Sequence, residues 1–190
     1  MTLFGGGAAA WPVSAHGQQS TKLLTIGYLG PNTRAVDGPR IDAFVQRLRE
    51  LGWLDGRTMA IEYRWAEGRN EHLDDMAAEL VRRQVDVIVT SATPPTTAAK
   101  QATSVIPIVF AAVGDPVGAG LVQSLARPGG NATGLSLQQT DTVGKRLGLF
   151  RELTPGLRHL AIMANSANAS AELEMREAQA AARTPRSAPS

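Results

Sequence analysis

Three hydroxyl-bearing residues follow one apolar, β-branched segment of the chain. A strand-like segment over residues 85–89 leads to Thr90, Ser91 and Thr93, and a helix-like stretch over residues 93–102 comes next. The N-terminus of a helix presents free N–H groups and partial positive charge, which suits a carboxylate ligand. Thr93 followed by a proline is also an ordinary helix cap. The sequence therefore supports two interpretations of this segment, an anion-binding site and a structural cap.

Two further polar residues follow other strand-like segments. Asn32 comes after the apolar residues 23–29, and Asp115 comes after residues 106–113. Because ligands of open parallel sheets bind beyond the carboxyl ends of the strands, we expect both residues at the same edge as Thr93. Asp115 would pair with a ligand ammonium there. The alternative is an Asx turn that has no part in binding.

Alternating strand-like and helix-like segments separate these candidates. The strand-like segments are residues 23–29, 59–65, 85–89, 106–113 and 133–137, and the segments with helical spacing of apolar residues are 39–51, 73–81 and 93–102. This alternation predicts βαβ units with right-handed crossovers, and hence the fold class α/β with a doubly wound parallel sheet. The strands are mostly apolar on both faces, as a sheet covered by helices requires.

The same pattern begins again near residue 140. A helix is expected over about 143–153, a strand over 159–163 and an Ala/Glu-rich helix over 170–183. Asn165 follows this strand and would lie at the mouth of a second lobe. One strand and two helices do not complete a sheet, because stable sheets need about three or more strands. We therefore expect this second lobe to be incomplete.

Four regions are expected along the chain. Residues 1–21 resemble an export leader, because residues 2–13 are apolar and Ala15-x-Gly17 resembles a cleavage site, although the usual basic region is missing. A disordered Gly/Ala-rich tail is the alternative. The other regions are an N-terminal α/β lobe over 22–138, the start of the second lobe over 139–183, and a tail over 184–190.

Composition and motifs argue against several functions. The net charge is +2 and aromatic residues make up 5% of the chain, so nucleic acid is not favoured as a partner. The chain has no cysteine, and its three histidines lack metal-ligand spacing, so no metal site is expected. No GxGxxG, GxxxxGK[ST] or GxSxG string occurs, which predicts no nucleotide cofactor and no catalytic residue. No apolar run reaches the ~20 residues of a membrane span, so no direct membrane insertion is expected.

Several strings of the sequence resemble one family. They are LGWLDGR at 51–57, IEYRWA at 61–66, GDPVGAGL at 114–121 and SLARPGGNATG at 124–134. These strings are similar to those of ABC-transporter substrate-binding proteins of the tryptophan/tyrosine-uptake type. The resemblance covers about residues 22–183. It implies a two-lobed, periplasmic-binding-protein-like fold that holds its ligand between the lobes.

The resemblance also implies a function. The expected role is the solute-binding component of an ABC importer, which is not an enzyme, takes a small amino-acid-like ligand in the periplasm and works with a membrane permease. The ligand-binding residues expected are Asn32, Thr90, Ser91, Thr93, Asp115 and Asn165. Of the aromatic residues, only Tyr28 is expected near the mouth of the site.

Family members normally continue well past residue 183. A frameshift or premature stop is therefore a hypothesis, and very weak or absent ligand binding by this polypeptide is the expected consequence. A non-functional gene fragment is one alternative. A cytoplasmic single-domain α/β enzyme is the less favoured one.

Overall fold

The computed structural model describes residues 23–183. The leader-like residues 1–21 and the tail 184–190 lie outside the described residues. The strands are β1 (Leu24–Gly30), β2 (Met59–Trp65), β3 (Val87–Ser91), β4 (Ile108–Val113) and β5 (Ala132–Ser136). The helices are α1 (Arg34–Glu50), the short 3-10 helix η1 (Asn70–His72), α2 (Leu73–Arg82), α3 (Thr93–Ala102), α4 (Gln139–Leu153) and α5 (Ala169–Arg183).

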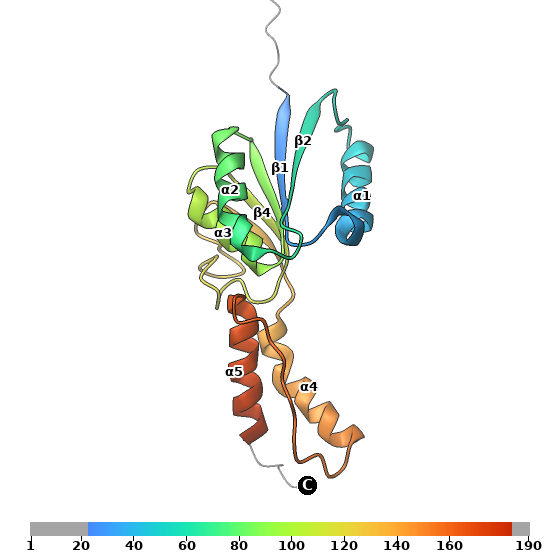
Figure 1. The fold of residues 1–190 in the computed structure, drawn as a ribbon, viewed down its shortest axis with the longest axis vertical. Helices are drawn as coiled ribbons and strands as arrows, with labels where there is room; N and C mark the ends of the chain where they lie inside the picture. Colours follow the sequence, from blue (N-terminus) through green and yellow to red (C-terminus); the bar gives the residue numbers. More distant parts are fainter. Residues whose placement is uncertain (1–22, 184–190) are drawn as a thin grey trace, which may run out of the picture.

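The five strands form one sheet in the order β2-β1-β3-β4-β5, and every neighbouring pair is parallel. Helices α2 and α3 lie on one side of this sheet and α1 lies on the other (Figure 1). The predicted α/β fold with a doubly wound parallel sheet is therefore confirmed. Since all strands run the same way, the loops after β1, β3 and β4 leave the sheet at one edge.

The main hydrophobic core lies between the sheet and the pair α2–α3. Alternate residues of the strands contribute to it, as the two-residue period of a strand requires. Buried members of this cluster include Leu29, Ala77, Leu80, Ile88, Ala98, Ile108 and Phe110. The core fixes α3 against β3 and β4, and so it fixes the loops that carry Thr93 and Asp115.

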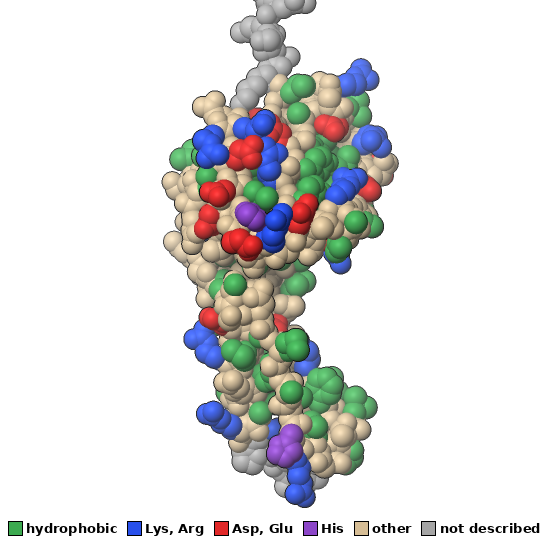
Figure 2. Space-filling model, in the orientation of Figure 1, with side chains coloured by type: hydrophobic (Ala, Val, Ile, Leu, Met, Phe, Trp, Pro, Cys, Tyr) green, Lys and Arg blue, Asp and Glu red, His purple; other side chains and the backbone are tan. Residues whose placement is uncertain are grey.

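Helices α4 and α5 form an arm beyond the carboxyl edge of the sheet, where they run side by side (Figure 1). Arg151 ties the far end of the pair by donating hydrogen bonds of 3.3 and 2.9 Å to the carbonyl oxygens of Ala181 and Ala182. Hydrophobic side chains remain on the surface of this arm (Figure 2); Phe150 is 54% exposed and Met163 fully exposed. The arm is therefore apolar on a side that nothing in the described chain covers.

Two predicted elements differ from the structure. The strand predicted over residues 159–163 is wrong, because this segment has no strand assignment and no neighbouring strand in the described chain offers it a ladder of hydrogen bonds. Helix α1 begins at Arg34, five residues before the predicted start at Pro39. The carbonyl oxygen of Thr33 accepts from the N–H groups of Val36 and Asp37, so a first turn forms ahead of the proline.

Charged side chains of both signs are intermixed on the face of the sheet region seen in Figure 2. One group of charged side chains joins strand β2 to helix α2. The Arg64 guanidinium donates two hydrogen bonds of 2.7 and 2.8 Å to the Glu79 carboxylate, which Arg83 also contacts. These bonds lower the pKa of Glu79 from 4.5 to about 2. No helix of residues 23–183 is long and apolar enough to cross a membrane.

Candidate functional site at the carboxyl edge of the sheet

Thr93 and Asp115 meet at the carboxyl edge of the sheet through a third residue, Ser170. The Ser170 hydroxyl oxygen lies 2.9 Å from Thr93 Oγ1 and accepts a 3.1 Å hydrogen bond from the backbone N–H of Asp115. Thr93 and Ser170 are both 2% exposed. The structure therefore joins the loops after β3 and β4 to the first turn of α5, which belongs to the predicted second lobe.

The start of helix α3 differs from its prediction. Thr93 is the first helical residue and not the N-cap, which is Ala92. Ala92 has no side-chain cap to offer and adopts φ +68° and ψ 171°, a conformation that costs a non-glycine residue about 1–3 kcal/mol. Because Thr93 is the first helical residue and not the N-cap, its hydroxyl does not cap its own helix and instead bonds Ser170 of α5.

The other two hydroxyl-bearing residues of this segment, Thr90 and Ser91, differ in their exposure to solvent. Thr90 is fully buried, and its hydroxyl is hydrogen-bonded over 2.7 Å to that of Thr96. Ser91 ends strand β3 and is partly exposed. Thr90 therefore fixes the first turn of α3 against the strand. The hydroxyl of Thr93 is the one that contacts α5 at the carboxyl edge of the sheet.

Asp115 lines a cavity of about 350 Å³ at the same edge. Its Oδ1 accepts a 2.8 Å hydrogen bond from the N–H of Gly118, which is the predicted Asx-type turn, and this leaves the second carboxylate oxygen for another partner. A second carboxylate, that of Asp141, lines the cavity as well. Two anions in one cavity favour a cationic group such as an ammonium.

A second cavity of about 270 Å³ lies in front of the α3 N-terminus. It is lined by Thr93, Pro94 and Thr97 from α3, by Asn70, Leu73 and Asp74, and by Ala167 and Ala169 ahead of α5. Thr93 is one of the lining residues but is itself buried, and the Asp74 carboxylate in the same lining does not favour an anion there.

Asn32 and Asn165 do not join the Thr93–Asp115 contact. The Asn32 amide donates hydrogen bonds of 3.1 and 3.2 Å to the two carboxylate oxygens of Asp37, a residue that is only 3% exposed. Asn165 is exposed, and its Oδ1 accepts from the N–H of Ala167. Each amide therefore stabilises its own loop in this conformation.

Three aromatic residues cluster on β1 and β2, at the side of the sheet away from the β4 loop that carries Asp115. The Tyr28 ring lies 4.9 Å from that of Trp65, and the rings of Tyr63 and Trp65 are parallel with centroids 6.0 Å apart. Burial raises the pKa of Tyr28 to about 12, and the nearby Asp37 carboxylate adds to this shift. Tyr63 and Trp65 alternate on one face of β2, which was a signal readable in the string IEYRWA.

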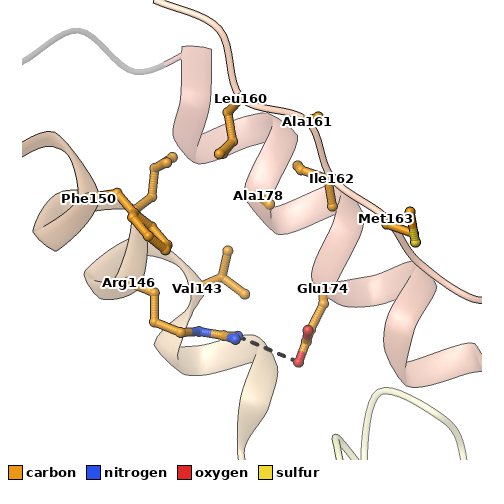
Figure 3. Close-up of a pocket in the computed structure, with 10 residues that line it drawn as sticks. Val143, Arg146, Phe150, Leu160, Ala161, Ile162, Met163, Glu174 and Ala178 are labelled. Carbon is orange, nitrogen blue, oxygen red and sulfur yellow. Dashed lines mark ion pairs between the residues drawn. The ribbon is translucent and has the colours of Figure 1, made fainter. Parts of the chain in front are cut away.

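A cavity of about 310 Å³ lies apart from these residues, between α4, α5 and the extended segment before α5 (Figure 3). Val143, Leu147, Phe150, Leu160 and Ile162 make it largely apolar, and the Arg146–Glu174 ion pair of 3.5 Å closes one side. None of the predicted site residues lines it. Among residues 23–183 no group of three or more His, Asp or Glu side chains could hold a metal ion.

Comparison with known proteins identifies the family of the chain. A family model described as ABC transporter substrate binding protein matches residues 35–185. The chain therefore belongs to the ABC transporter substrate-binding protein family, whose members bind solutes and are not enzymes.

Individual relatives share about half of their length with the chain. A tyrosine-binding protein of Clostridioides difficile is 32% identical over 160 residues, which are 82% of this chain and 45% of that protein. The crystal structure of an ABC domain in complex with L-Trp from Streptococcus pneumoniae superposes with a TM-score of 0.73 at 28% identity, over 84% of this chain and 53% of that one. A conserved domain protein of Vibrio cholerae gives a TM-score of 0.75 at 31% identity, over 85% and 54%.

Proposed function

We propose that this chain provides the first wall of an amino-acid site in the solute receptor of an ABC importer. The observation that carries the proposal is the meeting of Thr93, Asp115 and Ser170 at the carboxyl edge of the sheet. Two of these residues come from the sheet-bearing lobe, and the third comes from the helix that follows it. A ligand held at this point would touch both parts of the molecule, as a receptor that closes by hinge motion requires.

The polar groups at this edge suit a zwitterion. The Thr93 hydroxyl and the N–H of Asp115 are donors for a carboxylate, and the positive end of the α3 dipole lies behind them. The carboxylates of Asp115 and Asp141 line the adjoining cavity and favour an ammonium. An α-amino acid carries both charges on one carbon, so it matches this pair of environments.

An aromatic side chain is the favoured choice within that class. Two relatives support it, one by its name as a tyrosine-binding protein and one by its L-Trp complex. The face formed by Tyr63 and Trp65 near the end of β2 offers stacking partners, and aromatic pairs contribute about 0.5–1.5 kcal/mol beyond burial.

The cellular context follows from family membership. We propose a periplasmic location and a membrane permease as partner, in keeping with the leader-like residues 1–21, which lie outside the described residues. Neither requires a membrane-spanning helix in the receptor itself.

Binding by this polypeptide alone should be weak. The relatives contain about as much chain again, and a two-lobed site takes about half its contacts from each lobe. Halving the binding free energy of a receptor with a dissociation constant of about 1 μM leaves one of about 1 mM. We therefore propose that the isolated chain binds an aromatic amino acid with a dissociation constant in the millimolar range.

Calorimetry with a matched set of compounds tests the proposal. L-tryptophan, L-tyrosine and L-glutamate would be compared with tryptamine, which lacks the carboxylate, and indole-3-propionate, which lacks the ammonium. At millimolar concentrations we expect measurable heat for L-tryptophan or L-tyrosine and weaker binding of both analogues. Equal binding of tryptamine and L-tryptophan, or no heat with any amino acid, would contradict the function, and micromolar affinity would contradict the proposed weakness.

A further inference from the structure

Ser170 is buried in a contact that sequence reasoning did not assign to it. Its hydroxyl oxygen accepts from the Asp115 N–H and shares a second hydrogen bond with the Thr93 hydroxyl. Both partners are groups that the proposed function assigns to a ligand. In this structure Ser170 therefore satisfies the donors that would otherwise be open to a bound molecule.

The position of Ser170 is fixed by its own helix. Asn168 Oδ1 accepts from the N–H groups of Ser170 and Ala171, over 3.1 and 3.4 Å, and so caps the start of α5. This cap places the Ser170 side chain in the first turn of α5, directed at the sheet edge. The hydroxyl reaches Thr93 and Asp115 as part of an ordered helix start.

Two glycines make room for this approach. A Cβ atom on Gly114 would lie 2.8 Å from Ser170 Cβ and 2.7 Å from Gln139 Oε1, and one on Gly118 would lie 2.7 Å from Leu173 Cδ1. Neither glycine has a positive φ, so backbone conformation does not call for glycine at these positions. Close packing of α5 on the β4 loop is a physical reason for Gly114, whereas at Gly118 the carboxylate of Asp115 in the same loop and Leu173 of α5 together leave no room for a Cβ atom.

We propose that the Ser170 hydroxyl occupies the position of a ligand carboxylate oxygen, so that a ligand must displace it. The proposal rests on the proposed function and deepens it. The Ser170 oxygen accepts from the Asp115 N–H and lies within hydrogen-bond distance of the Thr93 hydroxyl. A carboxylate oxygen in its place would accept from both groups. The Asp115 carboxylate, which lines the adjoining cavity together with that of Asp141, would then be the partner of the ligand ammonium.

Hydrogen exchange in the absence of any ligand tests the contact by itself. In Ser170→Ala the Asp115 amide loses its acceptor, and we expect its exchange to accelerate about five- to tenfold, as one lost hydrogen bond predicts. Ser166→Ala is the matched control, because Ser166 is exposed in the loop before α5. In this variant the Asp115 amide should exchange at the wild-type rate. Unchanged exchange in Ser170→Ala would overturn the proposal whatever the chain binds.

Titration with L-tryptophan and with tryptamine, followed by NMR, tests the displacement. Ser170→Ala should bind L-tryptophan about five- to tenfold more tightly than the wild type, because the ligand no longer competes with the hydroxyl. The affinity for tryptamine should be the same in Ser170→Ala as in the wild type, since tryptamine has no carboxylate oxygen to take the place of the hydroxyl. Equal or weaker binding of L-tryptophan to Ser170→Ala would overturn the displacement.

A cross-link between positions 93 and 170 distinguishes a failure of the proposed displacement from a failure of the proposed amino-acid binding. Thr93→Cys combined with Ser170→Cys adds the only two thiols to a chain that has no cysteine. The oxidised form should have a disulfide and bind L-tryptophan at least tenfold more weakly than the reduced form. If the exchange result holds but no form, Ser170→Ala included, binds L-tryptophan, the proposed function fails for this chain and the displacement fails with it. Equal binding by the oxidised and reduced forms would overturn the displacement alone.

Discussion

The hydroxyl oxygens of Thr93 and Ser170 lie 2.9 Å apart although 77 positions separate them in the chain. One residue starts the helix after the third strand, and the other lies in the first turn of the last helix. The contact joins the sheet-bearing part of the molecule to the arm formed by α4 and α5. It also marks the point at which we propose that a ligand is held.

The charge of Asp115 should decide whether an ammonium is recognised. Asp115→Asn keeps an oxygen that can accept from the Gly118 N–H, so the turn should persist and the free energy of unfolding should change by less than about 0.5 kcal/mol. Affinity for L-tryptophan should fall about tenfold, because a hydrogen bond to a charged group contributes about 1.5–3 kcal/mol. Binding of indole-3-propionate, which lacks the ammonium, should not fall. Calorimetry measures the free energy of unfolding and the affinities for the two compounds. An equal loss of affinity for both compounds would indicate a structural role of Asp115.

Glu79 should make the fold sensitive to acid. Its pKa is about 2 in the folded chain because Arg64 and Arg83 bind its carboxylate, compared with 4.5 when it is free. A lowered pKa contributes stability that is complete above the unfolded pKa and is lost as the pH falls toward the folded one. The free energy of unfolding of the wild type should therefore fall more steeply than that of Glu79→Gln between about pH 5 and pH 2.

Urea unfolding at a series of pH values measures this slope. Glu50→Gln is a suitable control, because the Glu50–Arg47 ion pair is exposed on both sides and such pairs contribute little. It should follow the wild-type curve. Parallel curves for the wild type and Glu79→Gln would show that the Arg64–Glu79 pair does not support the fold.

Ala92 should be replaceable by glycine with a gain in stability. Its φ of +68° with ψ of 171° is a conformation that glycine adopts readily and alanine does not. Ala92→Gly should raise the free energy of unfolding by about 1 kcal/mol, the relief of strain exceeding the added flexibility of the unfolded chain. Urea unfolding checks this. Ala78→Gly within helix α2 should instead lose about 1 kcal/mol, and a similar loss in Ala92→Gly would be evidence against strain at that position.

The sequence predicted the sheet-bearing part well because its signals are local. The apolar run before Gly30 and the helical spacing from Leu73 onward each identify an element without reference to the rest of the chain. The strand predicted over 159–163 was wrong for the opposite reason. A strand exists only with a partner, and none of the described strands lies beside that segment.

The meeting of Thr93 and Asp115 at one edge of the sheet was predictable, but the contacts that these residues make there were not. Parallel strands bring Thr93 and Asp115 to one edge by topology alone, and that expectation needs no side-chain detail. Ser170 was missed because its role depends on how α5 packs on Gly114 and Gly118, across more than fifty residues of sequence. The run Asn168-Ala169-Ser170 ahead of an Ala/Glu-rich helix was a readable sign of a capped helix start, and it did not indicate what that start would face.

The most direct test of the proposed site is where an amino acid perturbs the chain. Amide chemical shifts followed during titration of the wild type with L-tryptophan should change first at Thr93, Asp115 and Gly118 and at Ser170 opposite them. Glu79 on α2 should remain unshifted. Shifts confined to Val143, Leu147 and Phe150 would place the ligand in the apolar cavity of the α4–α5 arm and contradict the account.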